Sequence, residues 1–178
     1  MEIVTPSGVL RDWRPEDAAA LARQADSPEI AARMRDAFPS PYTLADARRF
    51  IAGATGSTTN LFLAIEVDGE VAGSIGIHPL EDVYRRTAEI GYWLGEEYRG
   101  RGIATDAVRT LAPFAFHRYD IMRLQAGVFS NNPASMRVLE RCGFAREAVH
   151  EKAIWKNDLL LDEHLYVRFG PGPGHRRP

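Results

Sequence analysis

The chain has 178 residues, 26% of them charged, and a formal net charge of −2, values typical of one globular domain. The slightly acidic balance gives no reason to expect a nucleic-acid partner, and no apolar run is long enough to span a bilayer, so no membrane partner is expected. The single cysteine, Cys142, excludes an intramolecular disulfide and, with no secretion signal at the start, predicts a cytoplasmic protein.

The first third of the chain is predicted to be mostly helical. A proline followed by two acids begins a helix over residues 15–25, and Ser27 before a proline caps a second helix. Thr43, with an acid three residues later, caps a third helix that we expect to run through Ile51. A short strand near residues 9–11 is the extended segment expected in this part.

The pattern then changes to short strands. Two strand-like runs, residues 61–67 and 71–77, flank an Asp-Gly turn that is a strong hairpin signal. Another strand is predicted over residues 87–94. It enters a turn rich in glycine and charge, residues 95–102, and a helix follows over residues 103–119.

The remaining segments complete a mixed α/β pattern. A strand over residues 124–129 precedes a short amphipathic helix that begins after Asn132 and ends at Cys142 and a glycine. Residues 144–155 and 162–169 are expected to form a closing antiparallel pair.

We find no internal repeat, so residues 1–169 are interpreted as a single α/β domain. The tail over residues 170–178 is rich in glycine and proline, has nothing to bury, and is predicted to be disordered.

The most informative segment is the turn before the long helix. Gly100 and Gly102 allow a bulky anion to approach the backbone, and the N–H groups and dipole at a helix start attract negative charge. Arg99 and Arg101 add positive charge, so the segment predicts a phosphate or pyrophosphate site. A kinase-type loop is excluded because no Lys-Ser/Thr pair follows, and the dinucleotide pattern fails because Thr105 occupies its third glycine position. The alternative is a tight turn whose glycines only satisfy a positive φ.

Three motifs in order carry a resemblance to a known family. Residues 99–104 read Arg-Gly-Arg-Gly-Ile-Ala, residues 88–94 read Ala-Glu-Ile-Gly-Tyr-Trp-Leu, and residues 132–144 begin Asn-Pro-Ala-Ser and end Gly-Phe. The first fits the R/Q-x-x-G-x-G/A loop of the GCN5-related N-acetyltransferase (GNAT) superfamily. The other two resemble its branch of ribosomal-protein alanine N-acetyltransferases. The resemblance spans residues 9–169 and implies a central twisted mixed sheet of about six to seven strands, with a splayed parallel pair, flanked by helices.

The resemblance implies that acetyl-CoA is bound as co-substrate. The pyrophosphate is expected to bind the glycine-rich turn, and the pantetheine arm is expected to bind unpaired backbone groups of the splayed strand. Asn132 is expected to contact the pantetheine or the substrate. No metal is expected, because the histidines are scattered without metal-ligand spacing. The implied cofactor-binding residues are Trp93, Leu94, Arg99, Gly100, Arg101, Gly102, Ile103, Ala104, Thr105 and Asn132.

Acetyl transfer to an amine requires loss of a proton from the amine and return of one to the departing thiolate. Glu89 is the candidate base, acting through water; the alternative is a surface carboxylate or an ion-pair partner. Many relatives have a tyrosine acid where this chain has Leu139, so Ser135 is the candidate acid, unless it is an ordinary polar residue in a helix's first turn. Some relatives use a glutamate in a later strand; Ile154 occupies that place here, so the role is absent or moved.

We therefore expect an N-acetyltransferase that moves acetyl from acetyl-CoA to a primary amine by direct attack, without Cys142 as nucleophile. The acceptor, a protein N-terminus or a small amine, is open, as is a larger donor such as succinyl-CoA. The alternative is a non-catalytic acyl-CoA-binding or sensing module. A homodimer is compatible with the branch, but no segment predicts it. His78, near the expected acceptor side, is either a substrate contact or a solvated loop histidine.

Overall fold

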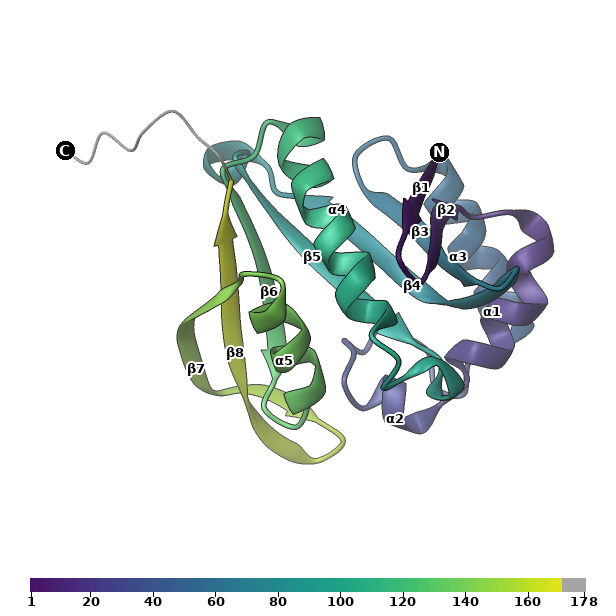
Figure 1. Cartoon of the computed structure of the whole chain (residues 1–178). Helices are drawn as coiled ribbons and strands as arrows, with labels where there is room; N and C mark the ends of the chain where they lie inside the picture. The colour runs from purple at the N-terminus through teal and green to yellow at the C-terminus, as the bar shows by residue number, and fades with distance from the viewer. Residues whose placement is uncertain (171–178) are drawn as a thin grey trace.

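The computed structural model describes residues 1–170, which form one eight-stranded sheet with helices on both faces (Figure 1). The strand order is β1-β2-β3-β4-β5-β6-β8-β7, and β5 with β6 is the one parallel pair among the described residues. The strands are β1 (Glu2–Thr5), β2 (Gly8–Asp12), β3 (Leu61–Val67), β4 (Glu70–Pro79), β5 (Thr87–Leu94), β6 (Arg123–Phe129), β7 (Ala145–Lys156) and β8 (Leu159–Phe169). The helices are α1 (Ala18–Ala25), α2 (Pro28–Ala31), α3 (Leu44–Gly56), α4 (Ile103–Tyr119) and α5 (Pro133–Arg141), with 3₁₀ turns at Pro15–Asp17, Asp82–Tyr84 and Glu96–Tyr98.

Most predicted elements are confirmed, and local chemistry explains where they begin. Thr43 and Asp46 form a reciprocal capping box at the start of α3, and the Ser27 side chain accepts a hydrogen bond from the Ile30 N–H at the start of α2. The strand expected over residues 87–94 and the helix over residues 103–119 have the bounds of β5 and α4.

The expected strand number of six to seven is wrong, because the sheet has eight strands. The prediction missed β1, a four-residue strand that pairs with β2 through the register Glu2↔Arg11 to Thr5↔Gly8. So short a strand gives little alternation, and its stability comes from pairing with β2 rather than from its own sequence. The third helix also continues five residues beyond Ile51, to Gly56.

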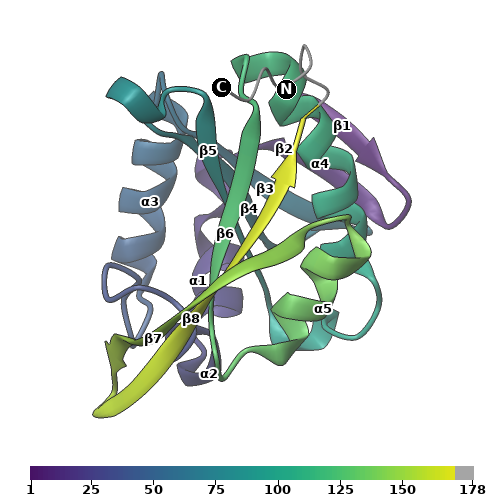
Figure 2. The same ribbon diagram turned by 90° about the vertical axis from the view of Figure 1, so that its left-hand side faces the viewer.

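Two apolar cores cover the two faces of the sheet. One lies between the sheet and α4 with α5, and includes the fully buried Leu111, Leu124 and Leu139. The other lies under α1 and α3 and is rich in aromatic side chains, including Trp13 and Tyr42. Figure 2 shows α1 and α3 on one side of the sheet and α4 and α5 on the other. One face of β5 therefore packs against the core under α4 and α5, and the other face packs against the core under α1 and α3.

The parallel strands β5 and β6 separate after a short contact. Their register holds only for Thr87↔Arg123, Ala88↔Leu124 and Glu89↔Gln125, after which the strands diverge (Figure 1). Beyond that contact β6 stays paired with β8 as far as Phe129. The edge of β5 that faces β6 thus has no sheet partner after Glu89, which confirms the splayed pair.

The predicted disordered tail, apart from Gly170, lies outside the described residues. Within residues 1–170, no helix has the length and apolarity needed to cross a membrane.

Candidate active site

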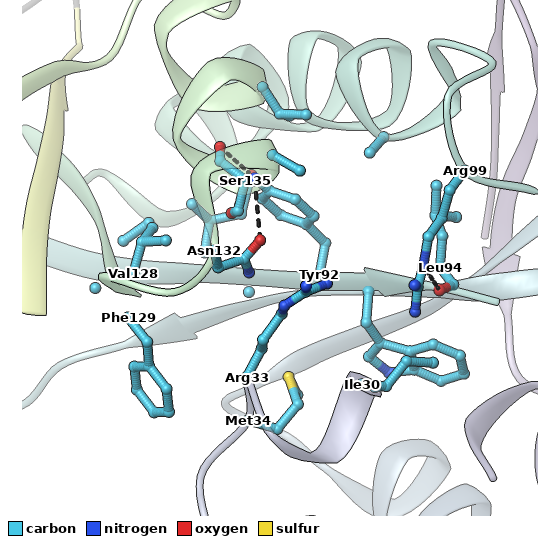
Figure 3. A pocket seen from close by; sticks show the side chains of 18 of the residues that line it. Ile30, Arg33, Met34, Tyr92, Leu94, Arg99, Val128, Phe129, Asn132 and Ser135 are labelled. Carbon is cyan, nitrogen blue, oxygen red and sulfur yellow. Dashed lines mark hydrogen bonds between the residues drawn. The ribbon is translucent and has the colours of Figure 1, made fainter. Parts of the chain in front are cut away.

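A cavity of about 270 Å³ occupies the opening between β5 and β6. Its walls come from β5 residues 90–94, β6 residues 126–129, the start of α5, the turn before α4 and the α2 segment (Figure 3). The side of β5 without a sheet partner faces this opening. Backbone N–H and C=O groups without a ladder partner favour a ligand that itself carries amides. The cavity therefore suits an extended, peptide-like chain.

The turn at one end of the cavity is built to accept an anion. Gly102 occupies the N-cap position of α4 with φ +81°, and no side chain caps the helix there. Gly100 has φ +73°, and a Cβ at either glycine would have no heavy atom within 4 Å. The first N–H groups of α4 and its dipole therefore face a space that side chains leave open.

Basic side chains flank this turn, with one acid between them. Arg99 donates from Nε to the Leu94 carbonyl oxygen at 3.3 Å and pairs with Glu29 at 2.7 Å. Glu29 also pairs with Arg33 at 2.7 Å, and its contact with Arg99 lowers the pKa of this carboxyl. The Arg101 guanidinium lies 5.6 Å from the centre of the Tyr98 ring. Arg33, Arg99 and Arg101 thus bring positive charge to this end of the cavity, although Glu29 pairs with two of them.

The structure brings many of the predicted cofactor-binding residues to this cavity. The predicted residues that line it are Trp93, Leu94, Arg99, Gly100, Ala104 and Asn132. Ile103 and Thr105 are only 3% and 9% exposed, so their side chains belong to the core and only their backbone can meet a ligand. Arg101 and Gly102 are exposed on the turn beside the cavity.

Asn132 and Ser135 lie together at the start of α5. The Asn132 Oδ1 accepts a hydrogen bond from the Ser135 N–H at 3.3 Å, so this amide caps the helix while it lines the cavity (Figure 3). The Ser135 Oγ lies 2.9 Å from the Tyr92 Oη. Burial raises the pKa of Tyr92 well above its ordinary value, so its phenol is neutral.

Glu89 lies where β5 and β6 begin to part. Its carboxylate pairs with Arg35 at 3.2 Å and accepts a weak hydrogen bond from Gln125 Nε2 at 3.4 Å. Arg35 is 78% exposed, so the ion pair is open to solvent. Glu89 is on the face of β5 that also carries Trp93, opposite the face that carries Tyr92, because side chains alternate along a strand.

Sequence reasoning missed several residues of the site. The sequence motif contains Tyr92 without assigning it a role. No sequence pattern indicates the lining side chains of Ile30, Arg33 and Met34, because they enter from a separate segment. At the position of the expected tyrosine acid, Leu139 is fully buried in the core.

The acid Glu163 of β8 and the two acids of the turn after β5 have hydrogen-bond partners in the structure. Ile154 pairs with Leu161 in the closing hairpin, whereas Glu163 of β8 lies against Gly127 at the opening and pairs with His150 at 2.9 Å. The acids after β5 tie their turn to α1 and its flank, because Ser27 donates to Glu96 at 2.8 Å and Gln24 to Glu97 at 2.6 Å. Among residues 1–170 no group of three or more potential ligands is placed to hold a metal ion.

Comparisons with known proteins agree with this architecture. "Probable N-acetyltransferase YjcK" of Bacillus subtilis is 35% identical over 104 residues, which are 58% of this chain and 58% of that protein. The ribosomal-protein-serine acetyltransferase of Escherichia coli is 33% identical over 108 residues, 61% of this chain and 59% of that one. The chain thus aligns with less than two thirds of either relative.

A solved structure and a family model extend the match. The microcin C7 self-immunity acetyltransferase MccE, solved with acetyl-CoA and AMP, superposes with a TM-score of 0.78 at 28% identity, covering 93% of this chain and 97% of that one. The model of the acetyltransferase (GNAT) domain matches residues 9–145. With its splayed strands and glycine-rich helix start, the chain belongs to the GNAT acetyltransferase family.

Proposed function

We propose that the protein is an N-acetyltransferase that moves the acetyl group of acetyl-CoA to a primary amine by direct attack. The observation that carries this proposal is the cavity in which the open edge of β5, the uncapped start of α4 and the Ser135 hydroxyl meet. Membership of the GNAT family supports it. The residues present fit acetyl-CoA, because the cavity offers unpaired backbone to an amide chain and a positive helix start to a pyrophosphate.

Each part of the donor has candidate partners in the chain. Backbone N–H groups of residues 99–105 bind the pyrophosphate, and Arg99 with Arg101 adds charge. Arg33 supplies a further cation from the α2 segment, which the sequence did not indicate. The edges of β5 and β6 hold the pantetheine arm, while the amide nitrogen of Asn132 stays available because its oxygen caps α5.

The chemistry needs two proton transfers and no covalent enzyme intermediate. The amine lone pair attacks the thioester carbonyl carbon, a C–N bond forms and the C–S bond breaks. Glu89 accepts the proton lost by the nitrogen, through water, and Ser135 gives its hydroxyl proton to the departing sulfur. Solvent then restores both groups, so the products are the N-acetylated amine and CoA thiol.

Tyr92 acts as a positioning residue for Ser135. When the neutral phenol donates its hydrogen bond to the Ser135 Oγ, the serine proton is free to point into the cavity. A serine hydroxyl is a weak acid, so its orientation toward the sulfur decides how well it works.

The acceptor is a protein N-terminus or a small amine. An α-amino group has a pKa of about 7.7–8.0, whereas a lysine amine has a pKa of about 10.4. The α-amino group therefore loses its proton more readily and depends less on Glu89 as a base. The Escherichia coli relative is named a ribosomal-protein-serine acetyltransferase, and this name favours a protein acceptor. The proposed location is the cytoplasm, and a homodimer is compatible with this function.

One pair of measurements tests the proposal. Acetyl-CoA and, in parallel, succinyl-CoA are titrated into the protein by calorimetry, and CoA thiol release is followed with a panel of peptides and small amines. Binding of acetyl-CoA with amine-dependent release supports the transferase. Release from succinyl-CoA alone would assign a larger acyl donor. Binding without release from any amine would favour a non-catalytic sensing module, and no binding to either donor would overturn the cavity assignment.

A further inference from the structure

A second cavity of about 310 Å³ lies on the other face of β5, under α3 and the loop that follows α2. The first cavity is lined by the start of α5 and the turn before α4, whereas this one is lined by residues of α1 and α3. Figure 2 shows these two pairs of helices on opposite sides of the sheet. The two cavities share four lining residues, Met34, Gly91, Tyr92 and Trp93.

Gly91 keeps the wall between the two cavities thin. It is exposed, and a Cβ added there would have no heavy atom within 4 Å. Glu89 and Trp93 are on the same face of β5 as this position, because residues two apart in a strand share a face. A group in the second cavity therefore reaches the face of β5 that carries Glu89, the proposed base, two residues along the strand from Gly91.

The second cavity is lined by aromatic side chains that hold one another in place through ring packing. Phe38 packs edge-on against Trp93, with ring centres 6.0 Å apart, and its ring is tilted against that of Tyr42, with centres 5.0 Å apart. Phe50 packs edge-on against Phe62 at 5.6 Å. Rings held in this way offer a rigid apolar surface that does not have to be ordered when a ligand enters.

The polar groups in the wall are neutral or already paired. Asp46 lines the cavity, but its carboxylate accepts hydrogen bonds from Thr43 and pairs with Arg49, which is 73% exposed. The Ser74 hydroxyl donates to the Leu63 carbonyl at 3.3 Å. Burial raises the pKa of Tyr42 to about 12, so this phenol stays neutral.

His78 is a titratable side chain of this wall that keeps hydrogen-bonding capacity. Its ring stands 4.9 Å from that of Phe62, and its backbone pairs with Glu89 across the antiparallel strands. Burial lowers the pKa of His78 below its usual value, although Glu89 acts in the opposite direction. Within residues 1–170 the imidazole makes no hydrogen bond, so it presents one donor and one acceptor to a ligand.

We propose that this second cavity holds the acceptor and selects a primary amine carried on an uncharged aromatic or branched aliphatic group, with His78 as its polar contact. The proposal rests on the transferase function proposed above and names the substrate class. The aromatic walls favour one apolar group, and a cavity of about 310 Å³ is at the small end of ligand sites. A polyamine would find no unpaired carboxylate in these walls.

The test compares amino-acid amides that share an α-amino group and differ in side chain. Phenylalaninamide and leucinamide are compared with serinamide and lysinamide, and kanamycin represents the polycations. We expect kcat/KM for phenylalaninamide to exceed that for serinamide by about tenfold or more, because a buried apolar side chain gains that much from transfer out of water. Equal rates, or a preference for lysinamide or kanamycin, would overturn the substrate class.

Two alanines provide a matched pair of variants. Ala37 is exposed and lines the second cavity, whereas Ala52 is exposed on α3 and does not. Ala37→Trp should abolish the preference for phenylalaninamide, and Ala52→Trp should keep it. Phe50→Ala should reduce the preference by removing a wall. All three should keep the wild-type Kd for acetyl-CoA; an unchanged preference in Ala37→Trp would overturn the location.

A binding measurement separates this inference from the proposed function. Phenylalaninamide and serinamide are titrated into protein loaded with CoA, which has no acetyl group to transfer. Binding of phenylalaninamide that Ala37→Trp removes supports the cavity even if no amine is acetylated. No binding of phenylalaninamide overturns the inference, even if thiol release with other amines upholds the transferase.

Discussion

The phenolic oxygen of Tyr92 lies 2.9 Å from the Oγ of Ser135 and 3.2 Å from the carbonyl oxygen of the same residue. Tyr92 comes from β5 and Ser135 from α5, so this contact closes the donor cavity between the splayed strand and the helix. The phenol can donate to only one of these oxygens at a time. When it donates to the Oγ, the serine proton is free to point into the cavity, whereas when it donates to the carbonyl oxygen, the serine hydroxyl can donate to the phenol.

Removing either hydroxyl should slow the reaction without weakening donor binding. We expect Ser135→Ala to lower kcat about a hundredfold and Tyr92→Phe about tenfold, with the Kd for acetyl-CoA unchanged. The double variant should be no slower than Ser135→Ala, because Tyr92 acts only through the serine. Steady-state thiol release and calorimetry measure these effects. Multiplied losses in the double variant would show that Tyr92 acts independently.

The turn before α4 can be tested with a pair of glycines in the same backbone conformation. Gly102 has φ +81° and Gly69, in the β3–β4 hairpin, has φ +82°, and a Cβ at either meets nothing within 4 Å. Tryptophan should therefore cost similar stability at both positions, about 1–2 kcal/mol. Gly102→Trp should weaken acetyl-CoA binding about a hundredfold or more, while Gly69→Trp keeps it. Equal Kd values in a calorimetric titration would contradict the anion site.

Glu89 and Arg35 form an ion pair whose members can be removed separately. If Glu89 is the base, Glu89→Gln should lower kcat about a hundredfold. Arg35→Ala leaves the carboxylate in place and should change kcat by about twofold at most, since an exposed pair contributes little. Matching losses in the two variants would instead indicate that the ion pair is structural.

Cys142 should be dispensable for turnover. Its thiol is buried and donates to the Thr105 carbonyl at 3.3 Å, so Cys142→Ala should reduce the free energy of unfolding by about 1 kcal/mol and change kcat by less than about twofold. Complete loss of activity would point to an acetylated cysteine intermediate.

The same residue predicts a pH dependence of stability. Burial raises the pKa of the Cys142 thiol, although Arg109 and Arg168 oppose this effect. A pKa that is higher in the folded than in the unfolded chain stabilises the fold below the unfolded value of about 8.5, and this stabilisation is lost as pH rises through the folded value. Urea unfolding between about pH 7 and 10 should therefore show an alkaline decline that is smaller in Cys142→Ala.

Local signals made most elements of the fold predictable from the sequence, and they point to the glycine-rich turn as the candidate donor site. Capping residues such as Thr43, the Asp-Gly turn and the positive-φ glycines each act within a few residues of the structure that they specify. The missed parts depend on contacts between distant segments. Tyr92 is 43 residues from Ser135, and Glu29 is 70 residues from Arg99. The aromatic cavity is assembled in the same way, from α1, the loop after α2, α3, β3, β4 and β5.

The thin wall at Gly91 has a kinetic consequence. Cavities on opposite faces of one strand let two substrates be bound at the same time, each with its own way in and out. Initial rates measured against both substrates should then give intersecting rather than parallel lines in double-reciprocal plots, and CoA should compete with acetyl-CoA without competing with the amine.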